Sequence, residues 1–534
     1  MKIDFYQERI FDKNKTIKIS FNETVLSKLK TYSIEDYIND VTINGLEYTW
    51  KYICEYVLTY GENENLLNIK NFGELYEIGL AVQDKIKKKN NGQYYTPEDV
   101  AMVMSEYFNS VTGENICDVA CGTGKLILTF LDFIGEEKSK SLIKDGRLYL
   151  YDIDGVALNI CKTSILLKYG KELNDKVNCV VGDFLSTKIN LPGNCKVISN
   201  PPYAAIQQIG LYWEDTKVLK DSKELYSCFM EKIIRNCDSA VIITPYSFIS
   251  GAKFFSLRTL MNQCSGEIYS FDNVPGNIFC GRKHGIFNTN TSNSVRAAIT
   301  VLRKNNCNGF RLTPLIRFKS IERKALLKHN TMETFLSEKR QKISADFPAY
   351  YKCFKELQPL YDRIMEKSDN HTLSEIISND GKYTLSMANT CRYFTSAFSG
   401  LIKRNGLIIL HFEDEKKFNY AYCLINSSFA YWHWRLFDGG ITYPLGLLLK
   451  MPVIYNCLTD EDHVFFKQTF NEMSKEADKF IIRKNNVGVQ ENIKYPREYR
   501  YKINQRFFKI LNIKVDDSTM NLIHSNMALK VNVC

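Results

Sequence analysis

Short apolar runs that stop at glycine, acidic or proline residues recur in the second quarter of the chain. They lie just before Asp118 and at about 148–151, 177–181 and 196–199, and an amphipathic run from Lys125 to Phe133 follows the first. Short apolar runs bounded by turn residues are typical of buried strands, and their alternation with helical patterns is typical of a parallel sheet. The pattern therefore predicts an α/β fold with a doubly wound, Rossmann-like sheet.

The flanking regions show other patterns. Residues 1–90 favour helices and loops, with apolar spacing near 3.6 in the runs Thr49–Thr59 and Phe72–Ile86. After the sheet, a connector helix is predicted over Phe347–Lys367, and short strands then mix with helices. The later strands are expected at Tyr383–Met387, Leu407–His411 and Met451–Tyr455, and the later helices at Tyr420–Arg435, Asp460–Lys484 and Arg500–Leu511.

A chain of 534 residues exceeds what one hydrophobic core comfortably holds, so several domains are expected. The predicted boundaries follow the changes of pattern. They give a helical N-terminal region, a sheet domain, a connector and a mixed α/β C-terminal domain, at residues 1–90, 91–310, 311–369 and 370–534.

A glycine-rich turn follows the first predicted strand. It contains Asp118, Ala120, Gly122 and Gly124, and its small residues let a ligand approach the backbone closely. The spacing differs from the phosphate-cradling loop that ends in Gly-Lys-Ser/Thr and from the full dinucleotide fingerprint. A carboxylate at this position suits a ligand that carries an amine better than one that carries a pyrophosphate.

The next two predicted strands also end in acids. Asp152 and Ile153 follow the second run, where an acid can accept hydrogen bonds from both ribose hydroxyls. Asp183 and Phe184 follow the third run, where the acid can accept from an adenine amino group and the ring can pack on the purine. Each acid alone is more often a turn residue or a helix N-cap. Three such strand ends in order rarely arise by chance.

The fourth run ends in Asn200, Pro201, Pro202 and Tyr203. Two consecutive prolines fix φ and remove both backbone donors, so the carbonyls stay available as acceptors. An exocyclic amine can donate one hydrogen to the Asn200 side-chain oxygen and one to the Pro201 carbonyl, while a planar ring stacks on Tyr203. The alternative for these four residues alone is a plain Pro-Pro turn after a strand.

Together, residues 91–305 resemble the catalytic domain of the amino-group DNA methyltransferases, specifically the N6-adenine enzymes of the gamma arrangement. In that family the cofactor motifs precede the Asn-Pro-Pro-Tyr motif, and the target-recognition region lies C-terminal to it. The resemblance implies S-adenosyl-L-methionine as the cofactor. It assigns to the cofactor the residues Tyr95, Thr96, Pro97, Asp118, Ala120, Gly122, Gly124, Asp152, Ile153, Asp183 and Phe184.

The same resemblance implies that residues 200–203 are catalytic and that the target adenine leaves the DNA duplex, because its N6 lies in the base-pair plane. A second aromatic ring then packs on the far side of the flipped base, and Phe279 is the best match. The segment Cys280–Asn293 is longer than the usual connection, which makes Phe287 a rival. The other interpretation of Phe279 is an aromatic residue of the core.

Composition changes this picture only modestly. The formal net charge of +10 suits a polyanionic partner such as double-stranded DNA, although many soluble proteins are as basic. Sixteen cysteines without a CxxC pair and seven scattered histidines predict reduced thiols and no metal site. The N-terminus lacks a signal-peptide pattern, and the apolar stretch Ile441–Ile454 is too short for a membrane span. We therefore expect a cytoplasmic protein without a membrane partner.

Three functions stay open at this point. The first is a site-specific adenine-N6 DNA methyltransferase, either solitary or paired with a cognate restriction endonuclease. The second is a modification subunit that needs a separate specificity subunit, because the type I modification subunits share the segment Gln93–Pro97 most closely. The third is methylation of protein glutamine or of RNA amines, for which a C-terminal region of this size is not needed. The sequence indicates neither the recognition site nor the oligomeric state.

Overall fold

The computed structural model describes residues 34–60, 76, 79–80, 96–206, 214–279, 295–304, 307–391, 393–486 and 488–529. A large sheet with the strand order β3-β2-β1-β4-β5-β7-β6-β8 lies at its centre. Its strands are β1 (Asn115–Val119), β2 (Leu148–Asp152), β3 (Val177–Val181), β4 (Cys195–Ser199), β5 (Ser239–Pro245), β6 (Ser265–Phe271), β7 (Ala297–Arg303) and β8 (Gly309–Leu312). The neighbouring pairs are parallel except that β7 runs antiparallel to both β5 and β6.

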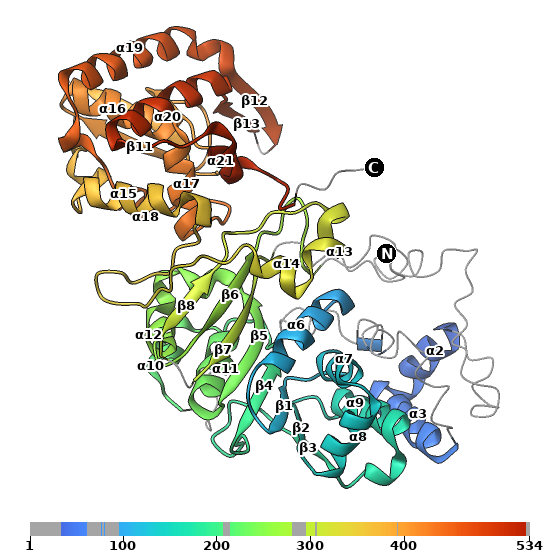
Figure 1. The fold of residues 1–534 in the computed structure, drawn as a ribbon. Helices are drawn as coiled ribbons and strands as arrows, with labels where there is room; N and C mark the ends of the chain where they lie inside the picture. Colours follow the sequence, from blue (N-terminus) through green and yellow to red (C-terminus); the bar gives the residue numbers. More distant parts are fainter. Residues whose placement is uncertain are drawn as a thin grey trace.

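Helices cover both faces of this sheet (Figure 1). One face carries α6 (Glu98–Ser110), α7 (Lys125–Ile134), α8 (Glu136–Lys144) and α9 (Gly155–Tyr169), and the other carries α10 (Lys217–Ser222), α11 (Leu225–Asn236) and α12 (Phe255–Met261). Strand β1 contributes to the core on each side, because Ile116 packs with the first group and Val119 with the second. The predicted doubly wound α/β fold is confirmed.

Two N-terminal helices, α2 (Ile34–Asn44) and α3 (Leu46–Tyr60), extend the sheet domain. Helix α3 packs on α9 and confirms the helix predicted over Thr49–Thr59. Its Trp50 is buried between Tyr37 and Tyr76, with each ring centroid 6.0 Å away in edge-on contact. Most of the helix predicted over Phe72–Ile86 lies outside the described residues.

The chain after β8 first stays with the sheet domain. Helices α13 (Arg323–Leu326) and α14 (His329–Glu333) follow it, and α14 contacts α6. Leu326 and Met332 are buried in the same core as α6 and α7. This first half of the predicted connector is therefore part of the sheet domain's packing.

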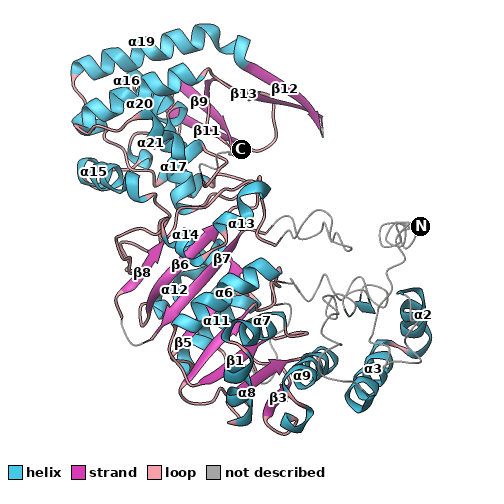
Figure 2. Ribbon diagram, turned by 45° about the vertical axis from the view of Figure 1, so that its right-hand side comes forward, coloured by secondary structure: helices cyan, strands magenta, loops and turns pink. Residues whose placement is uncertain are grey.

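The C-terminal region has a core of its own. Helices α15 (Gln358–Ser368), α16 (Glu415–Asn426), α17 (Ser428–Phe437), α18 (Leu445–Leu449), α19 (Asp460–Glu476), α20 (Arg497–Leu511) and α21 (Asp517–Asn521) surround it. A small antiparallel sheet in the order β10 (Ala397–Ser399), β9 (Tyr383–Ala388) and β11 (Leu407–Phe412) packs on α16. The hairpin of β12 (Ile481–Asn486) and β13 (Gly488–Ile493) projects from its side (Figure 2).

The strands predicted at Tyr383–Met387 and Leu407–His411 and the helix predicted at Arg500–Leu511 are confirmed. The strand predicted at Met451–Tyr455 is wrong, because this apolar segment is irregular and makes one isolated bridge, between Thr372 and Pro452. Proline has no N–H to donate to a ladder, so the segment buries its side chains without extending a sheet.

Three predicted helices have other limits. The helix over Tyr420–Arg435 is two helices that meet at Ser427, whose hydroxyl accepts from the Phe429 amide and caps α17. The helix over Asp460–Lys484 ends at Glu476, and β12 begins at Ile481. The connector helix begins only at Gln358, with proline in its first turn.

Candidate functional site

The predicted site residues follow the carboxyl ends of the parallel strands, and we call this side of the large sheet the carboxyl edge. Strands β1 and β4 are neighbours, and the chain passes from β1 outward through β2 to β3 before it returns to β4. Such a reversal of strand order opens a crevice between the connections that follow the two strands. The glycine-rich turn after β1 and Asn200–Tyr203 after β4 therefore follow neighbouring strands, whose ends are joined by a hydrogen bond from the Ser199 hydroxyl to the Val119 carbonyl at 2.6 Å.

The turn after β1 has a backbone shape that few side chains permit. Ala120, Gly122 and Gly124 have φ values of 61°, 54° and 92°, all in the left-handed region. A Cβ added to Gly124 would lie 2.4 Å from the Cys161 Sγ atom, whereas one added to Gly122 would meet nothing within 4 Å. Gly124 is thus required for packing against α9, and Gly122 faces open space that a ligand can fill.

Asp118, at the end of β1, is fully buried. Among the described residues neither carboxylate oxygen meets a donor in ordinary hydrogen-bond geometry, although the Ile127 backbone N–H helps the charged form. Burial raises the pKa of Asp118 well above its usual range, and the Asp152 carboxylate raises it further. An acid in this state favours a ligand that brings its own donors or positive charge.

Asp152, at the end of β2, holds the glycine-rich turn. Its two oxygens accept hydrogen bonds from the backbone N–H groups of Gly122 at 2.7 Å and Asp154 at 2.8 Å. Burial raises the pKa of Asp152 to about 6, and these two N–H groups oppose that rise. Asp154 is the N-cap of α9 and also accepts a hydrogen bond from the Tyr76 hydroxyl. The N-terminal region therefore supports this strand end.

Two exposed apolar side chains lie beside the acids. Ile153 is 70% exposed and Val181, the last residue of β3, is 62% exposed. Large apolar side chains at such exposure next to polar strand ends offer a surface for a flat ligand ring. The sequence did not indicate a site role for Val181, because this residue continues the apolar run of a predicted strand.

The two residues predicted at the end of β3, Asp183 and Phe184, differ in their exposure. Asp183 is partly exposed, and its side chain accepts a hydrogen bond from the Leu185 amide at 3.0 Å. Phe184 is only 3% exposed, and its ring packs against Tyr151 and Phe229. The Phe184 ring therefore belongs to the core of the sheet domain, and contact with a purine would be confined to its small exposed part.

Asn200 is oriented by the segment before α6. Its side-chain N–H donates to the Thr96 hydroxyl at 3.0 Å, which makes Oδ1 the acceptor of this amide. Pro201 is buried, while Pro202 and Tyr203 are half-buried. Thr96 and Pro97 precede the first turn of α6, whereas Tyr95 lies outside the described residues. The fold thus brings Thr96, which precedes α6, next to Asn200, which follows β4, although 104 positions separate them in the sequence.

A buried lysine fixes the other end of α6. The Lys196 ammonium donates to the backbone carbonyls of Phe108 at 2.9 Å and Val111 at 3.3 Å, at the C-terminus of the helix. Burial lowers the pKa of Lys196 to about 8. Helix α6 is therefore attached to β4 at both ends, and the sequence alone did not indicate this role for Lys196.

The two predicted stacking rings touch each other. The Tyr203 hydroxyl donates to the Ile243 carbonyl at 3.0 Å, which fixes this ring against β5. The centroid of Phe279 lies 5.9 Å from that of Tyr203 at an interplanar angle of 66°, and Phe279 is 7% exposed. A base between two parallel rings needs them about 7 Å apart. The pair is thus closed in this structure, and Phe287 lies outside the described residues.

Arg323 ties the Phe279 segment to α6. Its guanidinium makes two bonds to Asp99, at 2.5 and 2.8 Å, and donates to the carbonyls of Asn277 and Ile278. Asp99 is in the first turn of α6, next to the segment that orients Asn200. No sequence pattern indicates this pairing, because 224 positions separate Arg323 from Asp99.

S-adenosyl-L-methionine fits these residues on three structural grounds. Asp118 is a buried acid in need of donors, Gly122 borders open space, and Ile153 and Val181 offer apolar surface beside Asp152. These match an amine, a close backbone approach, a purine and ribose hydroxyls. In the described parts of the chain, no group of His, Cys, Asp or Glu residues is arranged to hold a metal ion. Nor does any described helix have the length and hydropathy to cross a membrane.

Parts of this chain are similar in sequence to known proteins. The methylase subunit of the type I restriction enzyme MpnII from Mycoplasma pneumoniae is 28% identical over 148 residues, covering 26% of each protein. That of EcoEI from Escherichia coli is 22% identical over 223 residues, covering 39% of this chain and 43% of the relative. The chain thus spans less than half the length of these relatives.

Among solved structures, that of the DrdV–DNA complex aligns with a TM-score of 0.47 and 13% identity, covering 74% of this chain and 59% of that one. The family model for N-6 DNA methylases matches residues 68–395, more than half of the sequence. This stretch runs from before α6 through the whole large sheet into the C-terminal region. The chain belongs to the N-6 DNA methylase family.

Proposed function

We propose that this protein is a DNA methyltransferase that transfers a methyl group from S-adenosyl-L-methionine to the N6 atom of adenine in double-stranded DNA. The observation that carries the proposal is the position of Asn200. Its amide lies at the switch point of the sheet, across from the glycine-rich turn, and is oriented by Thr96. This arrangement places an acceptor for an amine beside a site that fits an adenosine-bearing cofactor.

The chain's own residues orient the amine. The Asn200 Oδ1 atom and the Pro201 carbonyl accept the two N6 hydrogens, which directs the nitrogen lone pair away from both acceptors. Neither Pro201 nor Pro202 has an N–H that could compete for these carbonyls. The rate gain then comes from alignment and electrostatic placement rather than from a general base. The positive charge that develops on N6 is relieved afterwards by loss of a proton to water.

The bound cofactor would supply an electrophilic methyl group on its sulfonium. Thr96 and Pro97 would contact its methionine part, together with Tyr95. Asp118 would accept from its amine, Asp152 from its ribose and Asp183 from its purine amino group, while Ala120, Gly122 and Gly124 would keep the backbone close. Ile153 and Phe184 would line the purine, the latter with its exposed part only.

The target adenine would reach this site by base flipping. Extrusion of a base costs a few kcal/mol, which phosphate contacts and stacking on Tyr203 and Phe279 would offset. Because these two rings are in edge-on contact at 5.9 Å, Phe279 must move before a base can lie between them. The proposal therefore includes an opening of the segment that carries Phe279.

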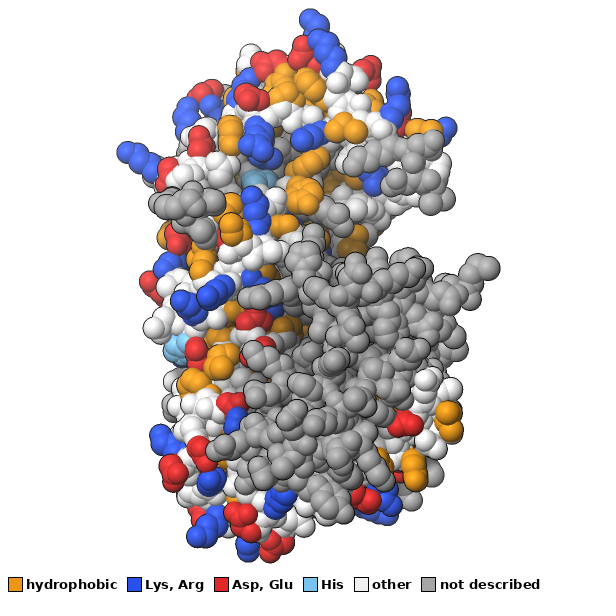
Figure 3. Space-filling view, turned by 90° about the vertical axis from the view of Figure 1, so that its right-hand side faces the viewer, with side chains coloured by type: hydrophobic (Ala, Val, Ile, Leu, Met, Phe, Trp, Pro, Cys, Tyr) orange, Lys and Arg blue, Asp and Glu red, His pale blue; other side chains and the backbone are white. Residues whose placement is uncertain are grey.

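The C-terminal region is proposed to recognise DNA. On the face that Figure 3 shows, lysine and arginine side chains of the described residues are scattered over this region among apolar ones. The Lys403 backbone N–H donates to the carboxylate of the β13 residue Glu491, the Arg404 guanidinium donates to the Glu491 carbonyl, and Tyr393 is 42% exposed. Tyr495 instead packs against Tyr422 and Tyr499, so it supports the core.

A second candidate is a modification subunit that methylates adenine only with a separate specificity subunit. It is favoured by the names of both sequence relatives, which are methylase subunits of type I restriction enzymes. Against it stands the separate core of the C-terminal region. A role beside a cognate restriction endonuclease is compatible with either candidate.

The test is methyl transfer by the purified chain alone, with tritium-labelled cofactor and duplex DNA. Asn200→Ala should lower turnover by at least about 10²–10³-fold, the size expected for loss of one placed hydrogen-bonding group. Its cofactor affinity should stay almost intact, because Asn200 contacts the target amine and reaches the cofactor segment only through its bond to Thr96. Asn236→Ala, at the exposed end of α11, is the matched control and should keep wild-type turnover.

The outcomes separate the candidates. Label in adenine of DNA without any partner supports the first, and label that appears only after a specificity subunit is added supports the second. Label in protein glutamine or RNA but not in DNA would contradict both. An equal loss of cofactor affinity and turnover in Asn200→Ala would contradict the assigned role of this residue.

A further inference from the structure

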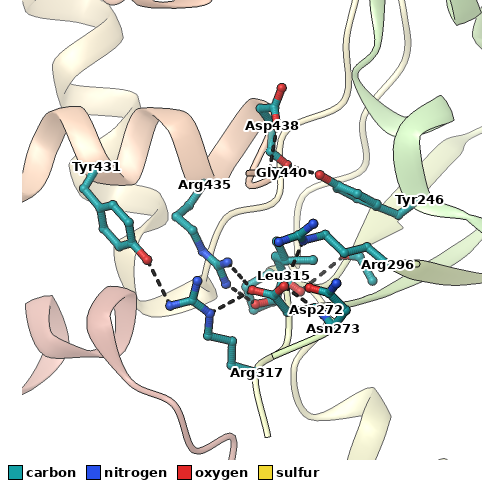
Figure 4. Close-up of polar contacts among 12 residues, drawn as sticks. Tyr246, Asp272, Asn273, Arg296, Leu315, Arg317, Tyr431, Arg435, Asp438 and Gly440 are labelled. Carbon is teal, nitrogen blue, oxygen red and sulfur yellow. Dashed lines mark hydrogen bonds and ion pairs between the residues drawn. The ribbon is translucent and has the colours of Figure 1, made fainter. Parts of the chain in front are cut away.

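A buried carboxylate with three arginine partners joins the sheet domain to the C-terminal region (Figure 4). Asp272 follows the last residue of β6, at the carboxyl edge, and is fully buried. We call Asp272 with Arg296, Arg317 and Arg435 the Asp272 cluster. Its members come from the end of β6, the start of β7, the segment after β8, and α17.

The bonds within the Asp272 cluster use both carboxylate oxygens. One oxygen accepts from the Arg296 Nε atom at 2.9 Å, and the other accepts from Arg317 Nε at 2.8 Å and Arg435 Nη1 at 2.7 Å. Burial alone would raise the pKa of Asp272, but the arginines, Arg435 first among them, lower it to about 2. The carboxylate therefore stays ionised and paired.

The C-terminal region contributes through one face of α17. Arg435 also donates to the Leu315 carbonyl at 2.7 Å, and the Tyr431 hydroxyl accepts from Arg317 at 2.9 Å. One turn further, the Asp438 carbonyl accepts from the Tyr246 hydroxyl, which follows β5, at 2.7 Å. Helix α17 is thus fastened to the ends of β5 and β6 by directional bonds.

The Asp272 cluster also begins the segment that carries Phe279. We call residues 273–279 the Phe279 loop. The Asn273 amide donates to the Asp272 carboxylate at 2.8 Å, and the Asp272 amide donates to Ile316. At its far end the loop is held by Arg323 and Asp99, as described above. One end of the Phe279 loop thus depends on α17 and the other on α6.

A second carboxylate with three arginine partners lies near the other end of β6. Glu267 pairs with Arg303 at 2.6 Å, Arg311 at 3.2 Å and Arg340 at 3.6 Å, and we call these residues the Glu267 cluster. All four belong to the sheet domain, and its arginine side chains are 34–37% exposed, against 3–10% in the Asp272 cluster. The same pairing therefore occurs once as a partly solvated contact and once as a buried joint.

We propose that Asp272 is a positioning residue through which the C-terminal region sets the placement of the Phe279 loop, and so the opening of the ring pair Tyr203–Phe279. This inference rests on the proposed function, in which that pair encloses the flipped adenine. A shift of α17 on binding DNA would move Arg435 and Arg317, and the carboxylate they hold would carry the start of the loop with it. Recognition and base capture would then share one mechanical link.

The test compares one substitution at equivalent places in the two clusters. Arg435→Lys keeps the charge in the Asp272 cluster but loses the planar fork that bonds Asp272 and Leu315 together. Arg303→Lys makes the same change in the Glu267 cluster and is the matched control. Tyr431→Phe is a milder second variant, which removes only the hydroxyl that holds Arg317 and serves if Arg435→Lys does not fold.

Two measurements are made on the full chain. Amide hydrogen exchange of the Phe279 loop, followed by mass spectrometry, should be about 2- to 30-fold faster in Arg435→Lys than in Arg303→Lys, the size expected for a mutation along a coupling network. The kcat for methyl transfer to DNA should fall by a similar factor, while the affinity for S-adenosyl-L-methionine stays the same in both variants.

The two proposals fail differently. Equal exchange of the loop in both variants would overturn the positioning role, as would faster exchange with an unchanged kcat. A wild-type chain that methylates no DNA, with or without a partner, would overturn the proposed function. In that case the exchange comparison still decides whether the Asp272 cluster holds the loop, because it needs no substrate.

Discussion

The polar groups at the carboxyl ends of β1 and β2 are paired differently from those at the opposite edge of the large sheet. At the ends of β1 and β2, Asp118 is buried and meets no donor in ordinary hydrogen-bond geometry among the described residues, Ala120 has a left-handed backbone, and Asp152 has a raised pKa. At the opposite edge, Lys196 donates to two carbonyls and Glu267 has three arginines. Strained backbone and raised carboxyl pKa values occur at the ends of β1 and β2, whereas paired groups hold elements together at both edges, as Asp272 does at the carboxyl edge. The contrast supports the site proposed at the ends of β1 and β2.

The strongest way to test this contrast is one substitution at a glycine on each edge. Gly124→Ala should destabilise the fold by about 2–4 kcal/mol, because it combines a left-handed backbone with a Cβ 2.4 Å from Cys161 Sγ. Gly146→Ala, before β2 at the opposite edge, has a φ of +67° and open space, so it should cost only about 1–2 kcal/mol. Urea unfolding of both variants measures the difference, and equal losses would remove the packing argument.

Asp152→Asn tests whether the acids of the carboxyl edge serve binding. It should weaken cofactor affinity by about 1.5–3 kcal/mol above pH 7, through loss of charge-assisted hydrogen bonds. Because the pKa of Asp152 is about 6, wild-type affinity should decline as the pH falls through 6, where the carboxylate gains a proton. Isothermal titration between pH 5 and 8 should show this decline in the wild type and a flat profile in Asp152→Asn. A decline that persists in the variant would identify Asp118 as the titrating group.

The smallest effect is expected at the opposite edge. The folded-state pKa of Lys196, about 8, lies below its value in the unfolded chain, so the unfolded chain keeps a proton that the folded chain releases. Between pH 7 and 9 the wild type should therefore gain about 1 kcal/mol of stability relative to Lys196→Met. Cofactor affinity should be the same in both proteins. A variant that loses affinity instead would show that α6 reaches the site from both of its ends.

Much of the sheet domain could be predicted because its central strands, such as β4, β5 and β6, are buried on both faces. In β4, for example, every residue is buried, and the run ends sharply at Asn200 and two prolines, which marks both the strand and the candidate site residue after it. Lys196 is a polar residue inside such a run, and nothing local indicates that its ammonium reaches the end of α6.

The secondary structure of the C-terminal region was harder to predict, because its apolar segments are buried among helices as well as in strands. The segment Met451–Tyr455 has the apolar pattern of a strand, but Pro452 and its burial among helices decide against one. Ser427 interrupts a helical pattern by a side-chain cap, which a periodicity argument does not detect. The joints at Asp272 and Arg323 connect residues more than 160 and 220 positions apart, so only the folded chain reveals them.

The hydrogen bond between Asn200 and Thr96 has a thermodynamic consequence. Thr96 lies in the segment proposed to meet the cofactor, and Asn200 in the one proposed to hold the adenine amine, so each ligand acts on one partner of the same bond. Any factor by which the first ligand strengthens binding of the second must equal the factor in the reverse direction. Cofactor and target base would then bind cooperatively, and either order of arrival would lead to the same ternary complex with the same total affinity.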